Sequence, residues 1–128
     1  VASVTDDFDG QTRSALSPVD IGADAGNFIF ADVTPPYIAF TPQASTCSLS
    51  PVTLTTTITD GSGVPTSGAG LPVLYWRINA GSYTAATAVH AGGDQYTFTF
   101  GGGVAVGDLV SYYIVAQDLA ATPNVGSN

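Results

Sequence analysis

The sequence predicts an all-β protein built as an antiparallel β-sandwich, and three observations support this fold class. Apolar and polar residues alternate with a period of two along several runs, which is typical of half-buried strands. Clusters of glycine and aspartate that favour tight turns separate these runs at short spacing, with no helical period between them. Threonine and valine abound, whereas lysine and glutamate are absent, so strand formers outweigh helix formers.

The clearest predicted strand is Val52–Thr59. Val52, Leu54 and Ile58 fall on one face of this run, and threonines occupy the alternate positions. We therefore expect one face of the strand to lie against the core and the hydroxylated face to contact water.

Residues 71–79 repeat this alternation with larger side chains. Leu74, Trp76 and Ile78 share one face, and Tyr75 falls on the other. We expect Trp76 to be a core residue, where loss of its ring would cost about 3–5 kcal/mol.

Two later runs, residues 96–100 and 109–117, alternate in the same way. Shorter runs at residues 37–41 and 82–89 are predicted as further strands. The side chains expected to form the core are Trp76, Leu54, Ile58, Phe98, Tyr112 and Ile114.

Charge excludes some classes of partner. All ten acidic residues are aspartate and the only basic residues are Arg13 and Arg77, which gives a formal net charge of −8. Such a field repels phosphate backbones and anionic lipid surfaces, so we expect no nucleic acid and no direct membrane insertion. A chain of 128 residues is the size of about one domain and can bury a real core.

The chain has two parts with different patterns. Residues 1–33 form an Asp-rich N-terminal segment with a candidate docking strand at residues 26–33, where Phe28 and Phe30 alternate with other apolar residues. Residues 34–128 are the predicted sandwich. No clear β run follows Asp118, so the sandwich is expected to lack its own last strand. The docking strand then packs against the sandwich of its own chain or of a neighbouring subunit, and both alternatives stay open.

Three stretches of the second part carry a family resemblance. They are Thr53-Leu54-Thr55-Thr56-Thr57-Ile58-Thr59-Asp60, Leu74-Tyr75-Trp76-Arg77 and Val110-Ser111-Tyr112-Tyr113-Ile114-Val115-Ala116-Gln117-Asp118. With them this part resembles the bacterial immunoglobulin-like or fibronectin type III-like modules of secreted and cell-surface proteins. The resemblance implies an immunoglobulin-like antiparallel β-sandwich, preceded here by an irregular Asp-rich segment.

The first part resembles a different family. Asp7-Phe8-Asp9-Gly10 with Arg13, followed by Asp20-Ile21-Gly22-Ala23-Asp24, is similar to the closing stretch of parallel β-helix surface proteins. Together the two resemblances imply a piece of a longer exported protein of the Bacteroidetes type, located outside the cell or on its surface.

The sequence offers little for catalysis. His90 is the only histidine, no nucleophile motif is present, and Asp60, Asp94 and Asp108 fall in predicted turns, where aspartate is common. Cys47 is the only cysteine and is expected to be a small apolar residue at the start of a strand. We therefore expect no enzyme, no catalytic, cofactor-binding or metal-binding residues, and no cofactor.

Two binding alternatives remain open. Asp7 and Asp9, followed by Gly10, place hard oxygen ligands close together, which suits calcium. Aromatic rings could instead form a platform for sugar stacking. The candidate rings for such a platform are Tyr75, Tyr83 and Tyr113.

These observations favour a non-catalytic, extracellular structural or adhesive module of a larger bacterial surface protein. Its expected partners are other domains or copies of the same protein, with self-assembly and a glycan as further candidates. One alternative is a carbohydrate-binding module of an exported enzyme. The other is a filament subunit assembled by strand exchange between chains.

Overall fold

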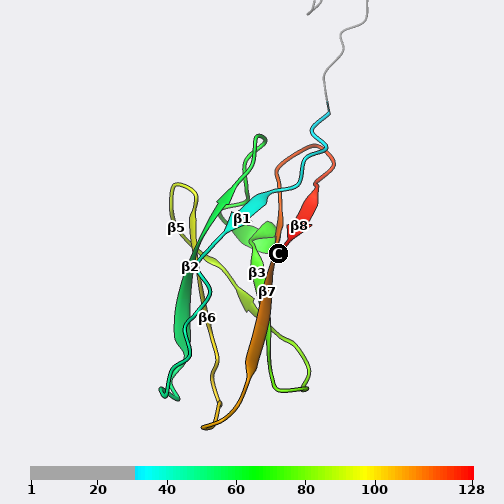
Figure 1. Ribbon diagram of the computed structural model, residues 1–128. Coiled ribbons are helices and arrows are strands. Elements are labelled where there is room, and N and C mark those ends of the chain that lie inside the picture. Colours follow the sequence, from blue (N-terminus) through cyan, green and yellow to red (C-terminus); the bar gives the residue numbers. More distant parts are fainter. Residues whose placement is uncertain (1–30) are drawn as a thin grey trace, which may run out of the picture. The chain divides into compact units, whose positions relative to one another are not determined.

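The computed structural model describes residues 31–128, of which Asp32–Asn128 form one compact unit. This unit contains two antiparallel four-stranded sheets (Figure 1). The first sheet has, in spatial order, β1 (Tyr37–Ala39), β2 (Val52–Thr59), β6 (Gln95–Phe100) and β5 (Val89–Gly92). The second has β4 (Thr84–Thr87), β3 (Val73–Ile78), β7 (Val110–Gln117) and β8 (Val125–Ser127). The only helical element described is the 3-10 turn η2 (Gly68–Gly70).

Consecutive strands pair two by two within a sheet, and the chain changes sheet between pairs. Thus β2, β4 and β6 are each followed by a strand of the opposite sheet. The predicted all-β antiparallel β-sandwich is confirmed.

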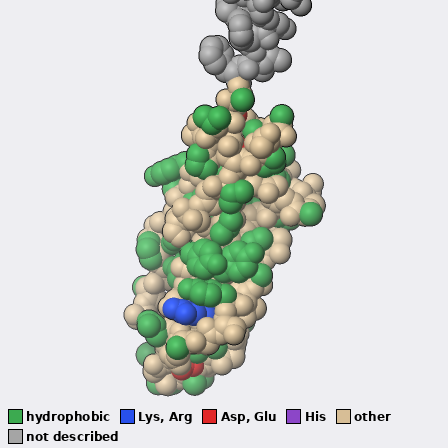
Figure 2. All heavy atoms as spheres, turned by 90° about the vertical axis from the view of Figure 1, so that its right-hand side faces the viewer, with side chains coloured by type: hydrophobic (Ala, Val, Ile, Leu, Met, Phe, Trp, Pro, Cys, Tyr) green, Lys and Arg blue, Asp and Glu red, His purple; other side chains and the backbone are tan. Residues whose placement is uncertain are grey.

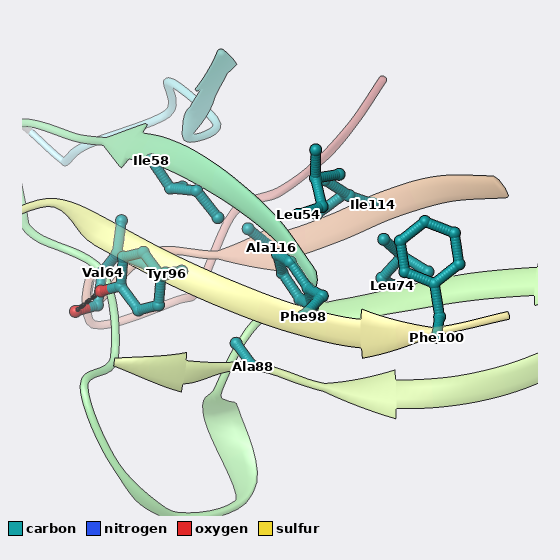
Figure 3. Close-up of a cluster of buried hydrophobic side chains, with 10 residues drawn as sticks. All are labelled: Leu54, Ile58, Val64, Leu74, Ala88, Tyr96, Phe98, Phe100, Ile114 and Ala116. Carbon is teal, nitrogen blue, oxygen red and sulfur yellow. Dashed lines mark hydrogen bonds between the residues drawn. The ribbon is translucent and has the colours of Figure 1, made fainter. Parts of the chain in front are cut away.

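The core lies between the inner faces of the two sheets (Figure 3). Its Phe98 is fully buried, and Leu54, Ile58 and Ile114 are buried beside it, as the alternation predicted. The threonines Thr53 and Thr55 on the other face of β2 are exposed. Period-two patterning therefore assigned the inner and outer faces of these strands correctly.

Trp76 does not occupy the centre of the core. It lies on the inner face of β3, with its ring centroid 6.3 Å from that of Phe100, but it is only partly buried, as is Tyr112. The largest fully buried side chains are instead Tyr96 and Phe98. We therefore expect loss of the Trp76 ring to cost less than the full core penalty predicted from the sequence.

The prediction that the sandwich lacks its last strand is wrong. Strand β8 pairs with β7 through Val115↔Ser127, Ala116↔Gly126 and Gln117↔Val125. With three residues and a central glycine, β8 is too short for an alternating pattern to identify it. The edge of β7 is thus covered along these three residues.

The candidate docking strand at residues 26–33 falls largely outside the described residues. Its described part, residues 31–33, forms no strand, and Val33 is exposed. Within residues 31–128, no helix combines the length and apolarity needed to cross a bilayer.

Gly126 brings β8 against the chain that enters the sandwich. A Cβ atom at this position would lie 2.8 Å from the carbonyl oxygen of Pro36, which is too close for two unbonded atoms. We expect Gly126→Ala to lower the free energy of unfolding by about 1–3 kcal/mol. Urea unfolding measures this, and Gly61→Ala is the control, because a Cβ there meets nothing within 4 Å. Equal midpoints for the two variants would contradict the close contact.

Candidate functional site

The three tyrosines predicted as a platform do lie together. Tyr75 of β3 and Tyr113 of β7 are register partners, and their rings stack with centroids 5.3 Å apart at 20°. Tyr83, which precedes β4, meets Tyr113 edge-on at 5.2 Å and 76°. We call these three residues with Arg77 the tyrosine–arginine patch.

Arg77 completes the patch from β3. Its guanidinium carbon lies 4.8 Å from the centroid of the Tyr83 ring, within the range of a cation–π contact. Its Nε is buried without a hydrogen-bond partner. Arg77 is the single Arg or Lys among residues 31–128, so the patch holds the positive charge of an otherwise acidic surface.

The patch is on the outer side of the sheet. Side chains alternate along β3, so Leu74 lies in the core and Tyr75 and Arg77 lie on the opposite face of the sheet. Figure 2 shows hydrophobic side chains gathered beside the single basic group on this side of the molecule. Because the inner faces already supply the core, these outer rings are available as a contact surface.

A second cluster consists of three carboxylates, and we call Asp32, Asp60 and Asp118 the carboxylate cluster. One oxygen from each lies within 4.8 Å of those of the other two. Asp32 belongs to the chain that enters the sandwich, Asp60 follows β2, and Asp118 follows β7. The ends of two strands from opposite sheets therefore meet the entering segment here.

Asn124 joins these elements. Its side-chain Nδ2 donates to Asp118 Oδ2 at 2.7 Å and to the carbonyl oxygen of Asp32 at 3.0 Å. Its backbone N–H donates to Asp118 Oδ1 at 2.8 Å. The Ser62 hydroxyl donates to Asp32 Oδ2, and the Ser62 N–H donates to Asp60 Oδ1 at 2.7 Å. The entering segment is thus attached to the sandwich by side-chain hydrogen bonds.

The carboxylate cluster contains the described acidic residues that could hold a hard cation, since calcium prefers several oxygen ligands. No sequence motif identifies this cluster, because its members are far apart in the chain. The sequence signal that could have indicated the cluster is the position of two of its members. Asp60 precedes a Gly-Ser turn, and Asp118 directly follows a predicted strand. The calcium alternative at Asp7 and Asp9 falls outside the described residues.

Hydrogen bonds set the titration of these acids. The Ser62 hydroxyl and the Thr34 N–H lower the pKa of Asp32. Burial raises the pKa of Asp118, but the hydrogen bonds from Asn124 and Ala120 lower it by more, so its net pKa lies below the ordinary value. Both carboxylates are therefore more stable as anions in the folded chain than in the unfolded chain.

This titration predicts acid sensitivity. A carboxyl with a depressed folded pKa stabilises the fold above its unfolded pKa of about 3.9, and this contribution is lost as the pH falls through the folded pKa. We expect the thermal midpoint to fall from about pH 5 downward. Thermal melts across this range, with a chelator present to remove metal ions, measure it. A midpoint that rises on acidification would mean that carboxylate repulsion outweighs the hydrogen bonds.

The other sequence candidates do not assemble into a site. His90 lies in β5, with Nε2 2.8 Å from the carbonyl oxygen of Gly93. Asp108 accepts from the Ala105 N–H at 2.8 Å and from Asn79 at 2.7 Å, and these bonds lower its pKa. It therefore serves a turn, as expected for aspartate at such a position. Asp94 is exposed between β5 and β6.

Cys47 is exposed in the loop between β1 and β2. The expectation that it begins a strand is wrong, because β2 begins five residues later, at Val52.

Comparisons with known proteins add no further constraint. A scan against protein-family models, a search of curated proteins and a search of solved structures each gave no match. The class that the geometry defines is an antiparallel β-sandwich with an aromatic outer surface.

Proposed function

We propose that this chain is a non-catalytic structural and adhesive module that acts outside the cell as part of a larger surface protein. The single observation that carries the adhesive role is the tyrosine–arginine patch on the outer side of a sheet. Tyrosine and arginine are enriched where proteins bind one another, because each combines apolar area with polar groups.

The fold supports the structural part of this proposal. In the two sheets, the order of strands by sequence position is 1-2-6-5 and 4-3-7-8, an arrangement compatible with the immunoglobulin-like resemblance of the sequence. The entering segment is held to the end of the sandwich by Asn124 and Ser62. A sandwich whose entering segment is fixed to one of its ends can act as a spacer in a longer chain.

The proposed partner of the patch is another copy or a sister domain of the same acidic surface protein. Arg77 would then meet an aspartate-rich surface, since the chain has ten aspartates and only two basic residues. The net charge of −8 on each copy opposes this contact at low ionic strength. Salt screens that repulsion over about 10 Å at 0.1 M, so association should strengthen as salt is added.

Clustering of beads coated with the full chain tests the adhesive role. We expect wild-type beads to cluster, more so in moderate salt, and Tyr75→Ser with Tyr113→Ser to abolish clustering. Tyr37→Ser is the matched control, because Tyr37 is exposed on β1 of the other sheet. The circular dichroism spectrum of each variant checks the fold.

Three outcomes count against adhesion through copies. Wild-type beads that stay dispersed at every salt concentration contradict it, as does clustering that survives loss of both patch tyrosines. Hits on a glycan array that disappear with Tyr75→Ser would favour the carbohydrate-binding alternative over adhesion.

A further inference from the structure

We propose that a cleft beside Trp76 binds a neutral sugar ring. The cleft has a volume of about 390 Å³, within the usual range for small-ligand sites, and Trp76 and Phe100 contribute its aromatic lining. It is distinct from the tyrosine–arginine patch, because Trp76 points to the inner side of β3 and Tyr75 to the outer side.

The cleft lies between an edge strand of one sheet and the end of β6 in the other sheet. Strand β4 is the terminal strand of its sheet, and its Thr84 is the register partner of Trp76. In the other sheet, β5 pairs with β6 only as far as Val89↔Thr97. The last three residues of β6 therefore have no partner strand on the side of β5, and from that sheet Phe100 packs against the indole.

The chemistry of the lining indicates the class of ligand. No charged side chain lines the cleft, so an ionic ligand would lose its hydration without a compensating partner. Apart from the indole N–H, its polar side chains are those of Thr84, Thr87, Thr97 and Thr99. Of these, Thr84 is the register partner of Trp76 and lies on the same face of the sheet, where its hydroxyl can both donate and accept a hydrogen bond, as sugar hydroxyls do. The Thr97 hydroxyl already donates to the carbonyl oxygen of Val89 at 3.3 Å.

The indole supplies the remaining element of recognition. Tryptophan offers a large apolar face for the C–H groups of a pyranose and one N–H donor for a hydroxyl. The stacked rings of Tyr75 and Tyr113 cover each other on one face, whereas Trp76 meets Phe100 at 50° rather than by stacking. The indole is therefore the better stacking surface for a sugar.

The only tryptophan of the chain makes a direct test possible. Its fluorescence is recorded while the full chain is titrated with glucose, galactose, mannose and N-acetylglucosamine, and with their short β-linked oligomers. We expect at least one neutral saccharide to shift the emission saturably. Glucuronate, an anionic sugar of the same size, should bind at least about tenfold more weakly.

Variants locate the site. Thr84→Val keeps the reporter and should weaken binding about tenfold, the usual effect of losing one hydrogen bond. Thr55→Val is the matched control, because Thr55 is an exposed threonine on the outer face of β2. Trp76→Leu, followed by calorimetry, should abolish binding, and Trp76→Phe should retain part of it.

Several results would overturn the inference. They are no saturable shift with any neutral saccharide, equal affinity for glucuronate, unchanged binding in Trp76→Leu, or a response only to an extended peptide added at the sheet edge. Loss of sugar binding in Tyr75→Ser with Tyr113→Ser would also move the site to the outer patch. If both proposals hold, these tyrosine substitutions abolish bead clustering and leave sugar binding intact. Failure of one proposal is therefore distinguishable from failure of the other.

Discussion

Replacement of Phe98 by alanine should destabilise the sandwich more than any other single change considered for the core. Phe98 is 0% exposed and lies between the two sheets, so its loss leaves a cavity that the surrounding strands fill only in part. Such substitutions cost about 3–5 kcal/mol, a large fraction of the roughly 5–15 kcal/mol that stabilises a typical domain.

Urea unfolding monitored by the single tryptophan measures this effect. Phe98→Leu keeps most of the apolar volume and should lose clearly less stability, so the comparison holds even if Phe98→Ala does not fold. Thr55→Ala, an exposed change on the outer face of β2, should stay within about 0.5 kcal/mol of wild type. Trp76→Ala lacks this reporter and is compared with Phe98→Ala by circular dichroism; if it proved the more damaging change, the assignment of the core centre would be wrong.

The second large effect is expected at Asn124. Asn124→Ala removes the amide that bridges Asp118 and the carbonyl oxygen of Asp32. Hydrogen bonds to charged groups contribute about 1.5–3 kcal/mol each, so we expect a loss in this range, or about 4–8 °C in thermal midpoint per kcal/mol. Thr122→Ala, at an exposed position of the same loop, is the control and should have little effect.

The pH dependence separates this cause from a general loosening of the loop. Without the Asn124 side chain, the pKa of Asp118 should move back toward its ordinary value, because a main cause of its depression is gone. The decline in stability on acidification should therefore be shallower in Asn124→Ala than in wild type. Parallel pH profiles for the two proteins would contradict the role assigned to the amide.

The strands with strong alternation were predictable from the sequence. In β3, β6 and β7, at least three successive alternate positions are apolar, and in β2 only Thr56 interrupts the apolar face. The structure places Leu54, Leu74, Phe98 and Ile114 inside. The placement of Tyr75 and Tyr113 on one face followed from the same period, whereas Tyr83 precedes β4 and is placed by no alternation. The contact of Tyr75 with Tyr113 required the register of β3 with β7, which the sequence alone does not specify.

Other features depend on contacts between distant residues. Strand β8 has too few residues for a period, and its position depends on pairing with β7 and on a glycine where the strand passes close to Pro36. The carboxylate cluster joins residues separated by 28 and 58 positions in the sequence, so no local motif indicates it. Trp76 is only partly buried, and alternation along β3 does not indicate how much of a side chain on the inner face stays exposed.

Hydroxyl-radical footprinting of the tyrosines, in free protein and in clustered beads, tests most directly whether the outer patch is the adhesive surface. We expect Tyr75, Tyr83 and Tyr113 to become protected in the clusters, while Tyr37 on the other sheet stays as reactive as in the free chain. Unchanged reactivity of the three patch tyrosines, or protection of Tyr37 alone, would contradict it.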